Sequence, residues 1–146
     1  CIKLGFKNVL CADMDKEVIE HLKKQNLNTI KSNLFNNIKG KFDLIIFNPP
    51  YLPEDKLEPK DSRNATTGGK KGYEIIIKFL VQAKSHLNKN GIILLLFSSL
   101  SKPNVILKKI KSLDFKPKLL SNKKLFFEEL YVYEIRTKKR KIKILN

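Results

Sequence analysis

The stretch Phe42-Asp43-Leu44-Ile45-Ile46-Phe47-Asn48-Pro49-Pro50-Tyr51 decides the fold of this chain. Its first part, residues 42–47, is mainly apolar, which predicts a strand buried inside a sheet. Pro49 and Pro50 end that strand, because neither residue can donate a backbone N–H to a neighbouring strand. The stretch therefore marks the carboxyl end of a buried strand, followed directly by polar and aromatic groups.

Helices alternate with strands on both sides of this stretch. Apolar residues recur at helical spacing before residue 25 and between residues 73 and 87, and Ser101 and Pro103 are typical of a helix cap and a first-turn proline. This alternation predicts an α/β fold with a doubly wound, mostly parallel sheet and helices on both faces. The expected strands are 9–12, 29–31, 42–47, 92–97, 116–120 and 130–136. The expected helices end near residue 25, cover 72–87 and run from 103 to 113.

The connections between these elements are polar. Residues 52–71 contain two prolines and the pair Gly68-Gly69, which predicts a long loop, and Asn90-Gly91 predicts a turn. The last two strands are predicted to form an antiparallel pair at the sheet edge. Phe126 and Phe127 in their connection are expected to contribute to core and edge packing. Residues 1–136 are predicted to form one domain and residues 137–146 a basic tail.

Polar side chains follow three of the expected strands, at Asp13, Asn33 and Asn48. In an open α/β sheet, ligands bind outside the carboxyl ends of the strands. Asn48 offers its side-chain carbonyl, and the proline pair fixes the backbone so that a main-chain carbonyl points the same way. Two such acceptors can hold one planar NH2 group and stabilise the positive charge that its nitrogen gains on attacking an electrophile. A proline-terminated strand with a capping Asn is the alternative, but the two other strand ends favour a functional site.

Four segments of the chain carry a resemblance to a known family: Phe47-Asn48-Pro49-Pro50-Tyr51, Ser32-Asn33-Leu34-Phe35, Gly68-Gly69-Lys70-Lys71-Gly72 and Leu87-Asn88-Lys89-Asn90-Gly91. They resemble S-adenosylmethionine-dependent methyltransferases with an Asn-Pro-Pro-Tyr motif. The chain looks most like the HemK-type protein glutamine methyltransferases, particularly the short archaeal and eukaryotic branch that modifies class I release factors. The resemblance covers nearly the whole chain and implies a class I, Rossmann-like fold.

The resemblance also implies a cofactor, S-adenosyl-L-methionine, and roles for individual residues. Asp13 would accept hydrogen bonds from the ribose hydroxyls, although it could instead cap the following helix, a role also open to Asp15. Asn33, where the family usually has an aspartate, would accept from the adenine amino group. The implied cofactor-binding residues are Asp13, Met14, Asn33, Leu34 and Asn48. The implied catalytic residues are Asn48, Pro49, Pro50 and Tyr51, with Tyr51 packing against the target group.

One departure from the family concerns the start of the chain. The family carries a glycine-rich loop after its first strand, where the backbone approaches the methionine part of the cofactor. This chain opens with Cys1, and residues 1–6 resemble the last turn of a helix. We therefore expect the first strand and its glycine-rich loop to be missing and the chain to be part of a longer protein.

Composition limits the partners of the protein. Its 30 Lys and Arg against 14 Asp and Glu give a net charge of +16, which favours acidic partners such as RNA or the ribosome, although lysines scattered through every segment can also reflect an AT-rich genome. The longest apolar run, 92–97, is far shorter than the roughly 20 residues of a membrane span. Two cysteines and no secretory signal predict a cytoplasmic location. No Cys or His spacing predicts a metal site.

The function that the resemblance implies is methyl transfer to the side-chain amide nitrogen of a glutamine, in the Gly-Gly-Gln loop of a peptide chain release factor. Two alternatives stay open. One is methyl transfer to an exocyclic amino group of a base in RNA or DNA, favoured by the charge but lacking a segment that could cradle a flipped base. The other is a catalytically inactive, basic RNA-binding scaffold. The short branch also works with a small zinc-binding activator subunit, so such a partner is expected.

Overall fold

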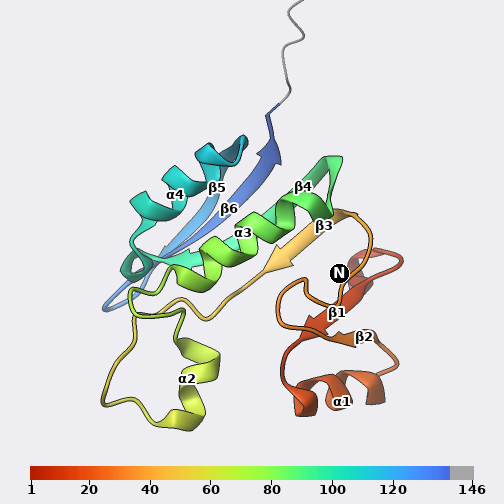
Figure 1. The fold of residues 1–146 in the computed structure, drawn as a ribbon, viewed down its shortest axis with the longest axis horizontal. Coiled ribbons are helices and arrows are strands. Elements are labelled where there is room, and N and C mark those ends of the chain that lie inside the picture. The colour runs from red at the N-terminus through yellow and green to blue at the C-terminus, as the bar shows by residue number, and fades with distance from the viewer. Residues whose placement is uncertain (139–146) are drawn as a thin grey trace, which may run out of the picture. The chain divides into compact units, whose positions relative to one another are not determined.

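The computed structural model describes residues 1–138, apart from the side chains of residues 60, 61 and 64. The chain divides into two compact units, Cys1–Gly40 and Lys41–Asn146. Their helices and strands are labelled in Figure 1. In chain order they are η1 (Ile2–Leu4), β1 (Leu10–Asp13), α1 (Lys16–Lys24), β2 (Asn28–Lys31), β3 (Phe42–Phe47), α2 (Lys60–Thr66), α3 (Glu74–His86), β4 (Leu87–Ser98), η2 (Ser99–Ser101), α4 (Pro103–Ser112), β5 (Phe115–Lys124) and β6 (Glu129–Thr137).

The first unit is built on a pair of parallel strands. β1 and β2 run side by side in register, so that Asp13 is opposite Lys31 where both strands end, and α1 packs against both. Asp15 is the N-cap of α1 and accepts a hydrogen bond from the backbone N of Glu17 at 2.7 Å. Ile19 is the buried residue of this helix. The two expected strands and the helix between them are therefore confirmed, and Asp15 rather than Asp13 caps the helix.

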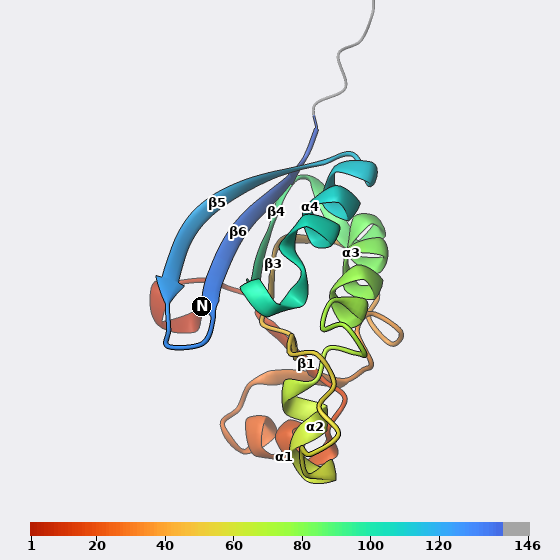
Figure 2. The same cartoon turned by 90° about the vertical axis from the view of Figure 1, so that its left-hand side faces the viewer.

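The second unit is a four-stranded mixed sheet in the order β3-β4-β6-β5. β3 and β4 are parallel, while β4 with β6 and β6 with β5 are antiparallel. The α/β fold class and the final antiparallel pair are confirmed, with β5 at the edge. α3 and α4 pack on each other, and both lie on the same face of this sheet (Figure 2). The helices expected on both faces of one sheet thus occupy one face in this unit.

The core of the second unit lies between that face of the sheet and the two helices. Alternate residues of β4, Ile93, Leu95 and Phe97, are fully buried, because successive side chains of a strand point to opposite faces. The ring of Phe97 stacks on that of Tyr133 in β6, with centroids 5.2 Å apart. Burial of each such side chain stabilises the fold by about 1.5–3 kcal/mol. The helices contribute the buried residues Ile76, Phe79, Leu80, Ala83, Ile106 and Ile110.

Two expectations about connections are wrong. The loop expected over 52–71 contains the short helix α2, because contacts outside the helix hold its residues in place. The turn expected at Asn90-Gly91 lies within β4, which begins at Leu87 rather than at residue 92. The pairing with β3 shifts there, and Gly91 is needed because a Cβ atom at this position would lie 2.9 Å from the carbonyl oxygen of Phe42.

Two expectations about the C-terminal half are also wrong. Pro103 occupies the first turn of α4 as expected, but the N-cap is Lys102, in the left-handed conformation with φ 53° and without a side-chain cap. Ser101 instead belongs to η2 and takes part in its capping box. Phe126 and Phe127 are 92% and 85% exposed, because they lie in the short connection between β5 and β6 rather than against the helices.

Among residues 1–138, no helix is long and apolar enough to cross a membrane. The same residues contain no group of three or more His, Cys, Asp or Glu side chains placed to hold a metal ion. The basic tail predicted for 137–146 falls almost entirely outside the described residues.

Candidate active site

The Asn-Pro-Pro-Tyr motif directly follows β3, as the sequence predicts. Asn48 is exposed, whereas Pro49 is buried and Pro50 and Tyr51 are half-buried. Among the residues that the structure describes, none hydrogen-bonds to the Asn48 side-chain amide. Its carbonyl oxygen is therefore free to accept a hydrogen bond from a ligand. A buried proline next to it holds the backbone in place without needing a hydrogen-bond partner for its nitrogen.

A serine fifty residues away fixes the end of this motif. The Ser101 hydroxyl is fully buried and donates a hydrogen bond to the Tyr51 carbonyl oxygen at 2.8 Å. The same hydroxyl oxygen accepts from the backbone N of Ser98 at 3.3 Å, as part of the capping box of η2. The short helix η2, which follows β4, therefore positions the end of the motif. Without Ser101 the Tyr51 carbonyl would lose its partner, at a cost of about 1–3 kcal/mol if it stayed buried.

Two glycines lie close to the backbone of the motif. A Cβ atom on Gly68 would lie 2.7 Å from the Pro50 carbonyl oxygen, and one on Gly72 would lie 2.6 Å from the Tyr51 carbonyl oxygen. Gly72 also has a φ of 82°, a conformation that side chains other than glycine rarely adopt. The segment Gly68-Gly69-Lys70-Lys71-Gly72 thus packs its backbone against the motif, which explains why glycines stand there.

After Tyr51 the chain leaves the motif and returns to it, and two backbone hydrogen bonds and one strand bridge join the two ends of this excursion. The backbone N of Leu52 donates to the Thr66 carbonyl oxygen, and the Gly68 N donates to the Leu52 carbonyl oxygen, both at 2.9 Å. Leu52 and Thr67 form an isolated parallel bridge. The segment 53–65 is therefore a closed loop whose two ends meet beside the motif.

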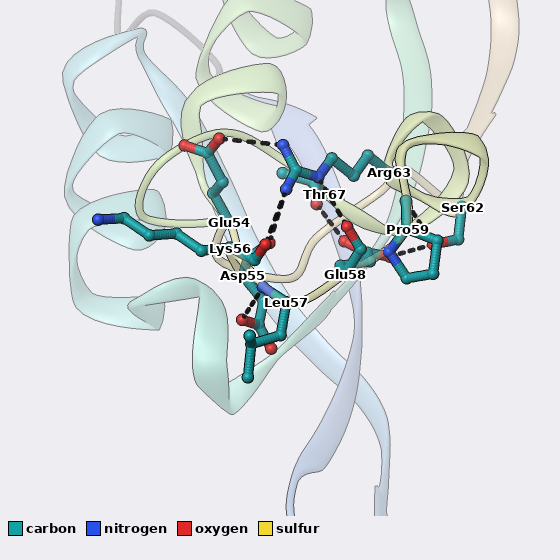
Figure 3. A network of polar contacts seen from close by, with 9 residues as sticks. All are labelled: Glu54, Asp55, Lys56, Leu57, Glu58, Pro59, Ser62, Arg63 and Thr67. Carbon is teal, nitrogen blue, oxygen red and sulfur yellow. Dashed lines mark hydrogen bonds and ion pairs between the residues drawn. The ribbon is translucent and has the colours of Figure 1, made fainter.

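Glu58 holds the helical part of this loop (Figure 3). Its carboxylate accepts hydrogen bonds from the hydroxyls of Ser62 and Thr67, each at 2.9 Å, and from the hydroxyl of Thr66. The Thr66 hydroxyl is the main reason why the pKa of Glu58 is lowered, followed among the favourable contacts by Thr67 and Ser62. These contacts explain why a short, polar helix forms here.

Arg63 ties the same helix to the first half of the loop (Figure 3). Its guanidinium donates to the carbonyl oxygens of Asp55, Lys56 and Glu58 at 3.2 Å, 3.3 Å and 3.2 Å. One of its terminal nitrogens lies 3.7 Å from the Glu54 carboxylate. Because a guanidinium presents five N–H donors in a fixed plane, one arginine can hold several turns of backbone.

The lowered pKa of Glu58 leads to a pH prediction. The pKa of an unfolded glutamate is about 4.3, and the pKa of Glu58 in the folded protein is lower, so the carboxylate stabilises the fold above about pH 4.3. This contribution is lost as the pH falls through the folded pKa. We expect Glu58→Gln to lower the thermal midpoint at pH 7 and to differ less from the wild type as the pH falls below 4.

Glu54→Gln is the matched control, since within the described part of the chain the Glu54 carboxylate has only its 3.7 Å contact with Arg63. We expect it to change the midpoint little at either pH. The measurement is thermal unfolding followed by circular dichroism at several pH values. A Glu58→Gln effect that stays constant down to pH 3 contradicts the role given to this carboxylate.

Glu128, in the connection between β5 and β6, affects the pKa of Tyr51. The pKa of Tyr51 is raised, first by burial and then by the negative charge of Glu128. The Oε2 atom of Glu128 is buried, and within residues 1–138 it has no hydrogen-bond partner. The sequence gives no hint of this placement, because Glu128 follows two phenylalanines in what reads as an ordinary turn.

The first unit brings together two of the expected cofactor-binding residues. Asp13 ends β1, and its Oδ1 accepts from the backbone N of Asp15 at 2.8 Å. The Ser32 N donates to the Asp13 carbonyl oxygen at 2.8 Å. The next residue after Ser32 is the exposed Asn33. Asp13 and Asn33 thus lie at the carboxyl end of the same pair of strands. Their contacts with a cofactor stay predictions, as do those of Met14, which is 56% exposed.

The loop after β2 is held by Ser32, which is 4% exposed. Its hydroxyl donates to the Leu34 carbonyl oxygen at 2.8 Å and accepts from the Asn37 N at 3.0 Å. Leu34 has a positive φ of 50°, which is uncommon for a side chain of this kind. The loop therefore presents Asn33 on a fixed, tightly bent backbone.

The chain is similar to several known methyltransferases. The family model described as "Eco57I restriction-modification methylase" matches residues 5–131. A Methanocaldococcus jannaschii protein named "Putative protein N5-glutamine methyltransferase" is 37% identical over 140 residues, which cover 90% of this chain and 71% of that protein. A release factor glutamine methyltransferase of Borreliella burgdorferi is 37% identical over 114 residues, covering 65% of this chain and 40% of that one.

A solved structure shows the same fold. It is the Mtq2-Trm112 complex of E. cuniculi, described as responsible for the methylation of the eRF1 translation termination factor. The match has a TM-score of 0.65 at 20% identity and covers 94% of this chain and 90% of that one. The fold and these relatives together thus define a class I methyltransferase that uses S-adenosyl-L-methionine. Within that class, the chain belongs to the protein glutamine methyltransferase family.

Proposed function

We propose that this protein transfers a methyl group from S-adenosyl-L-methionine to the side-chain amide nitrogen of a glutamine in a peptide chain release factor. The observation that carries the proposal is the exposed Asn48 side chain on a backbone fixed by buried Pro49 and by the Ser101 hydroxyl. The family supports the glutamine, because several relatives are named release factor glutamine methyltransferases.

The chemistry requires little more than positioning. An amide nitrogen is a poor nucleophile, so it must be held in line with the methyl group, and the charge that it gains must be stabilised. The Asn48 side-chain oxygen and the Pro49 carbonyl oxygen would accept one N–H each from the NH2 group. The cofactor supplies the electrophilic methyl group, and Asp13 and Asn33 would bind its ribose and adenine. No strong base is required if the proton leaves after the transfer.

A base in RNA or DNA is the second candidate substrate. Its exocyclic amino group is planar and weakly basic like an amide, and the match to a restriction-modification methylase model and the net charge of +16 favour it. Names of the more similar curated relatives favour a protein substrate instead. An inactive RNA-binding scaffold is the least supported reading, since the motif side chain is exposed rather than blocked.

We also propose a small activator subunit as partner, since the solved structure of similar fold is a two-protein complex. Zinc binding by that partner, contact with RNA or the ribosome, and a cytoplasmic location stay predictions. They do not affect the choice of substrate.

Labelled cofactor tests the proposal most simply. The protein is incubated with methyl-labelled S-adenosyl-L-methionine and either a release factor or RNA and DNA, with and without the activator. We expect label on the release factor, lost when the glutamine of its Gly-Gly-Gln loop is replaced by alanine. Label on nucleic acid alone contradicts the glutamine assignment, and absence of saturable cofactor binding supports the inactive scaffold.

A further inference from the structure

The connection between β5 and β6 lies at the same edge of the sheet as the Asn-Pro-Pro-Tyr motif. β3 is parallel to β4, whereas β6 is antiparallel to both β4 and β5, so β5 runs in the same direction as β3. The motif follows the carboxyl end of β3, and the connection follows that of β5 (Figure 2). A release factor that places its glutamine at Asn48 therefore presents the surface around that glutamine to this edge.

Hydrogen bonds through η2 tie the connection to the motif. The backbone N of Glu129, where β6 begins, donates to the Ser99 hydroxyl oxygen at 3.0 Å. Ser99 begins η2, and Ser101 at its end donates to the Tyr51 carbonyl oxygen at 2.8 Å. Burial and, after it, the charge of Glu128 raise the pKa of Tyr51, which supports the same closeness. The connection is therefore held in a fixed place beside the motif.

The tip of this connection is apolar and exposed. Leu125, Phe126 and Phe127 follow one another, and all three side chains are exposed, the two phenylalanines almost completely. The phenyl rings meet edge to face, with centroids 4.7 Å apart, and the backbone N of Leu125 closes the turn by donating to the Glu128 carbonyl oxygen at 2.8 Å. Leu100 of η2 is exposed as well. Large apolar side chains exposed together are typical of interaction sites.

Charges of both signs border the tip. Lys123 and Lys124 precede it and are exposed, and neither lies within ion-pair distance of an acidic side chain in residues 1–138. Glu128 and Glu129 follow it. An apolar centre with a polar rim is the usual composition of a protein–protein interface. Two adjacent carboxylates would repel the phosphates of a nucleic acid, so the tip fits a protein surface better than RNA or DNA.

We propose that Leu125, Phe126 and Phe127 form a docking surface for the substrate protein, which binds an apolar patch of the release factor outside its Gly-Gly-Gln loop. This inference rests on the proposed function and adds a specificity-determining surface to it. The Gly-Gly-Gln sequence has no apolar side chain that could cover two phenyl rings, so the partner of the tip lies elsewhere on the release factor. Exposed aromatic side chains at such a place contribute much of the affinity of an interface.

The double variant Phe126→Ser/Phe127→Ser tests the inference. The probes are a fluorescently labelled full-length release factor and a labelled short peptide containing only its Gly-Gly-Gln loop. Each is titrated with the full chain, the activator subunit and S-adenosylhomocysteine. We expect the Kd for the full-length release factor to rise about 10- to 100-fold, the loss that corresponds to one buried phenylalanine, while the peptide Kd stays unchanged. The thermal midpoint should stay at the wild-type value, because neither ring packs in the core.

Two further variants serve as controls. Leu119→Ser/Leu120→Ser removes two half-exposed apolar side chains from β5 itself, away from the tip, and should leave both Kd values unchanged. Phe126→Leu/Phe127→Leu keeps the tip apolar and should retain most of the affinity for the full-length release factor.

The outcomes separate the inference from the proposed function. If the wild type and Phe126→Ser/Phe127→Ser bind the full-length release factor equally tightly, the inference fails and the proposed function stands. A loss of equal size for the peptide, or in the Leu119→Ser/Leu120→Ser control, also overturns the inference. If the phenylalanine variant loses an RNA oligonucleotide but not the release factor, the occupant is nucleic acid and the inference is wrong. If the wild type binds neither release factor nor peptide, both the proposed function and the inference fail.

Discussion

Asn48→Ala is expected to lower the turnover number about 100- to 1,000-fold, while the affinity for S-adenosyl-L-methionine changes little. The lost side-chain oxygen acts on the substrate nitrogen, and the removal of one preorganised polar group from a site of developing charge has an effect of this size. The group is available for this role because Asn48 is exposed. Single-turnover kinetics with labelled cofactor, together with a cofactor titration, give both quantities.

Asn88→Ala is the control for this substitution. Asn88 is an asparagine in β4, whereas Asn48 follows β3. The Asn88 side chain donates to the Asp43 carboxylate at 2.7 Å, near the start of β3. Asn88→Ala should leave the turnover number near the wild-type value. A large loss of cofactor binding by Asn48→Ala with normal turnover would contradict the assigned role.

Asp13→Asn is expected to raise the Kd for S-adenosyl-L-methionine about 10- to 100-fold. Two ribose hydroxyls need two acceptor oxygens, and one of those of Asp13 becomes an NH2 group in the variant. The other oxygen still accepts from the backbone N of Asp15, so the local turn is kept. The lost bond to a charged acceptor corresponds to about 1.5–3 kcal/mol. Isothermal titration of the cofactor measures the change.

Asp15→Asn is the matched variant, since it removes the same charge two residues away. Asp15 accepts from the Glu17 N at 2.7 Å as the cap of α1, and asparagine caps a helix as well as aspartate does. We expect its cofactor Kd to equal that of the wild type. If both variants weaken the cofactor equally, the effect is one of overall charge, and Asp13 has no specific role.

Parts of the fold could be predicted because local composition decides them. Residues 42–47 form β3 as expected, since a short apolar run followed by two prolines has few other stable structures. By contrast, α2 could not be predicted, because its stability depends on the carboxylate of Glu58 and the guanidinium of Arg63. β5 extends to Lys124, well beyond the expected residue 120, because an edge strand tolerates a lysine-rich sequence that resembles a loop.

The same distinction applies to the candidate site. The sequence could place the motif, Asp13 and Asn33 at strand ends, and their functional roles stay predictions. Ser101 was expected to cap a helix, but its partner is Tyr51, fifty residues earlier in the sequence. No sequence pattern marks Glu128, and what distinguishes it from Glu129 is that its buried Oε2 has no hydrogen-bond partner within residues 1–138. Contacts between distant residues thus account for what sequence reasoning missed.

A crystal structure of the protein with S-adenosylhomocysteine and a release-factor peptide tests the central claim most directly. We expect the glutamine amide nitrogen to lie about 2.7–3.2 Å from both the Asn48 side-chain oxygen and the Pro49 carbonyl oxygen, and to face the cofactor sulfur. A glutamine bound elsewhere, or an Asn48 side chain turned away from the peptide, would contradict it.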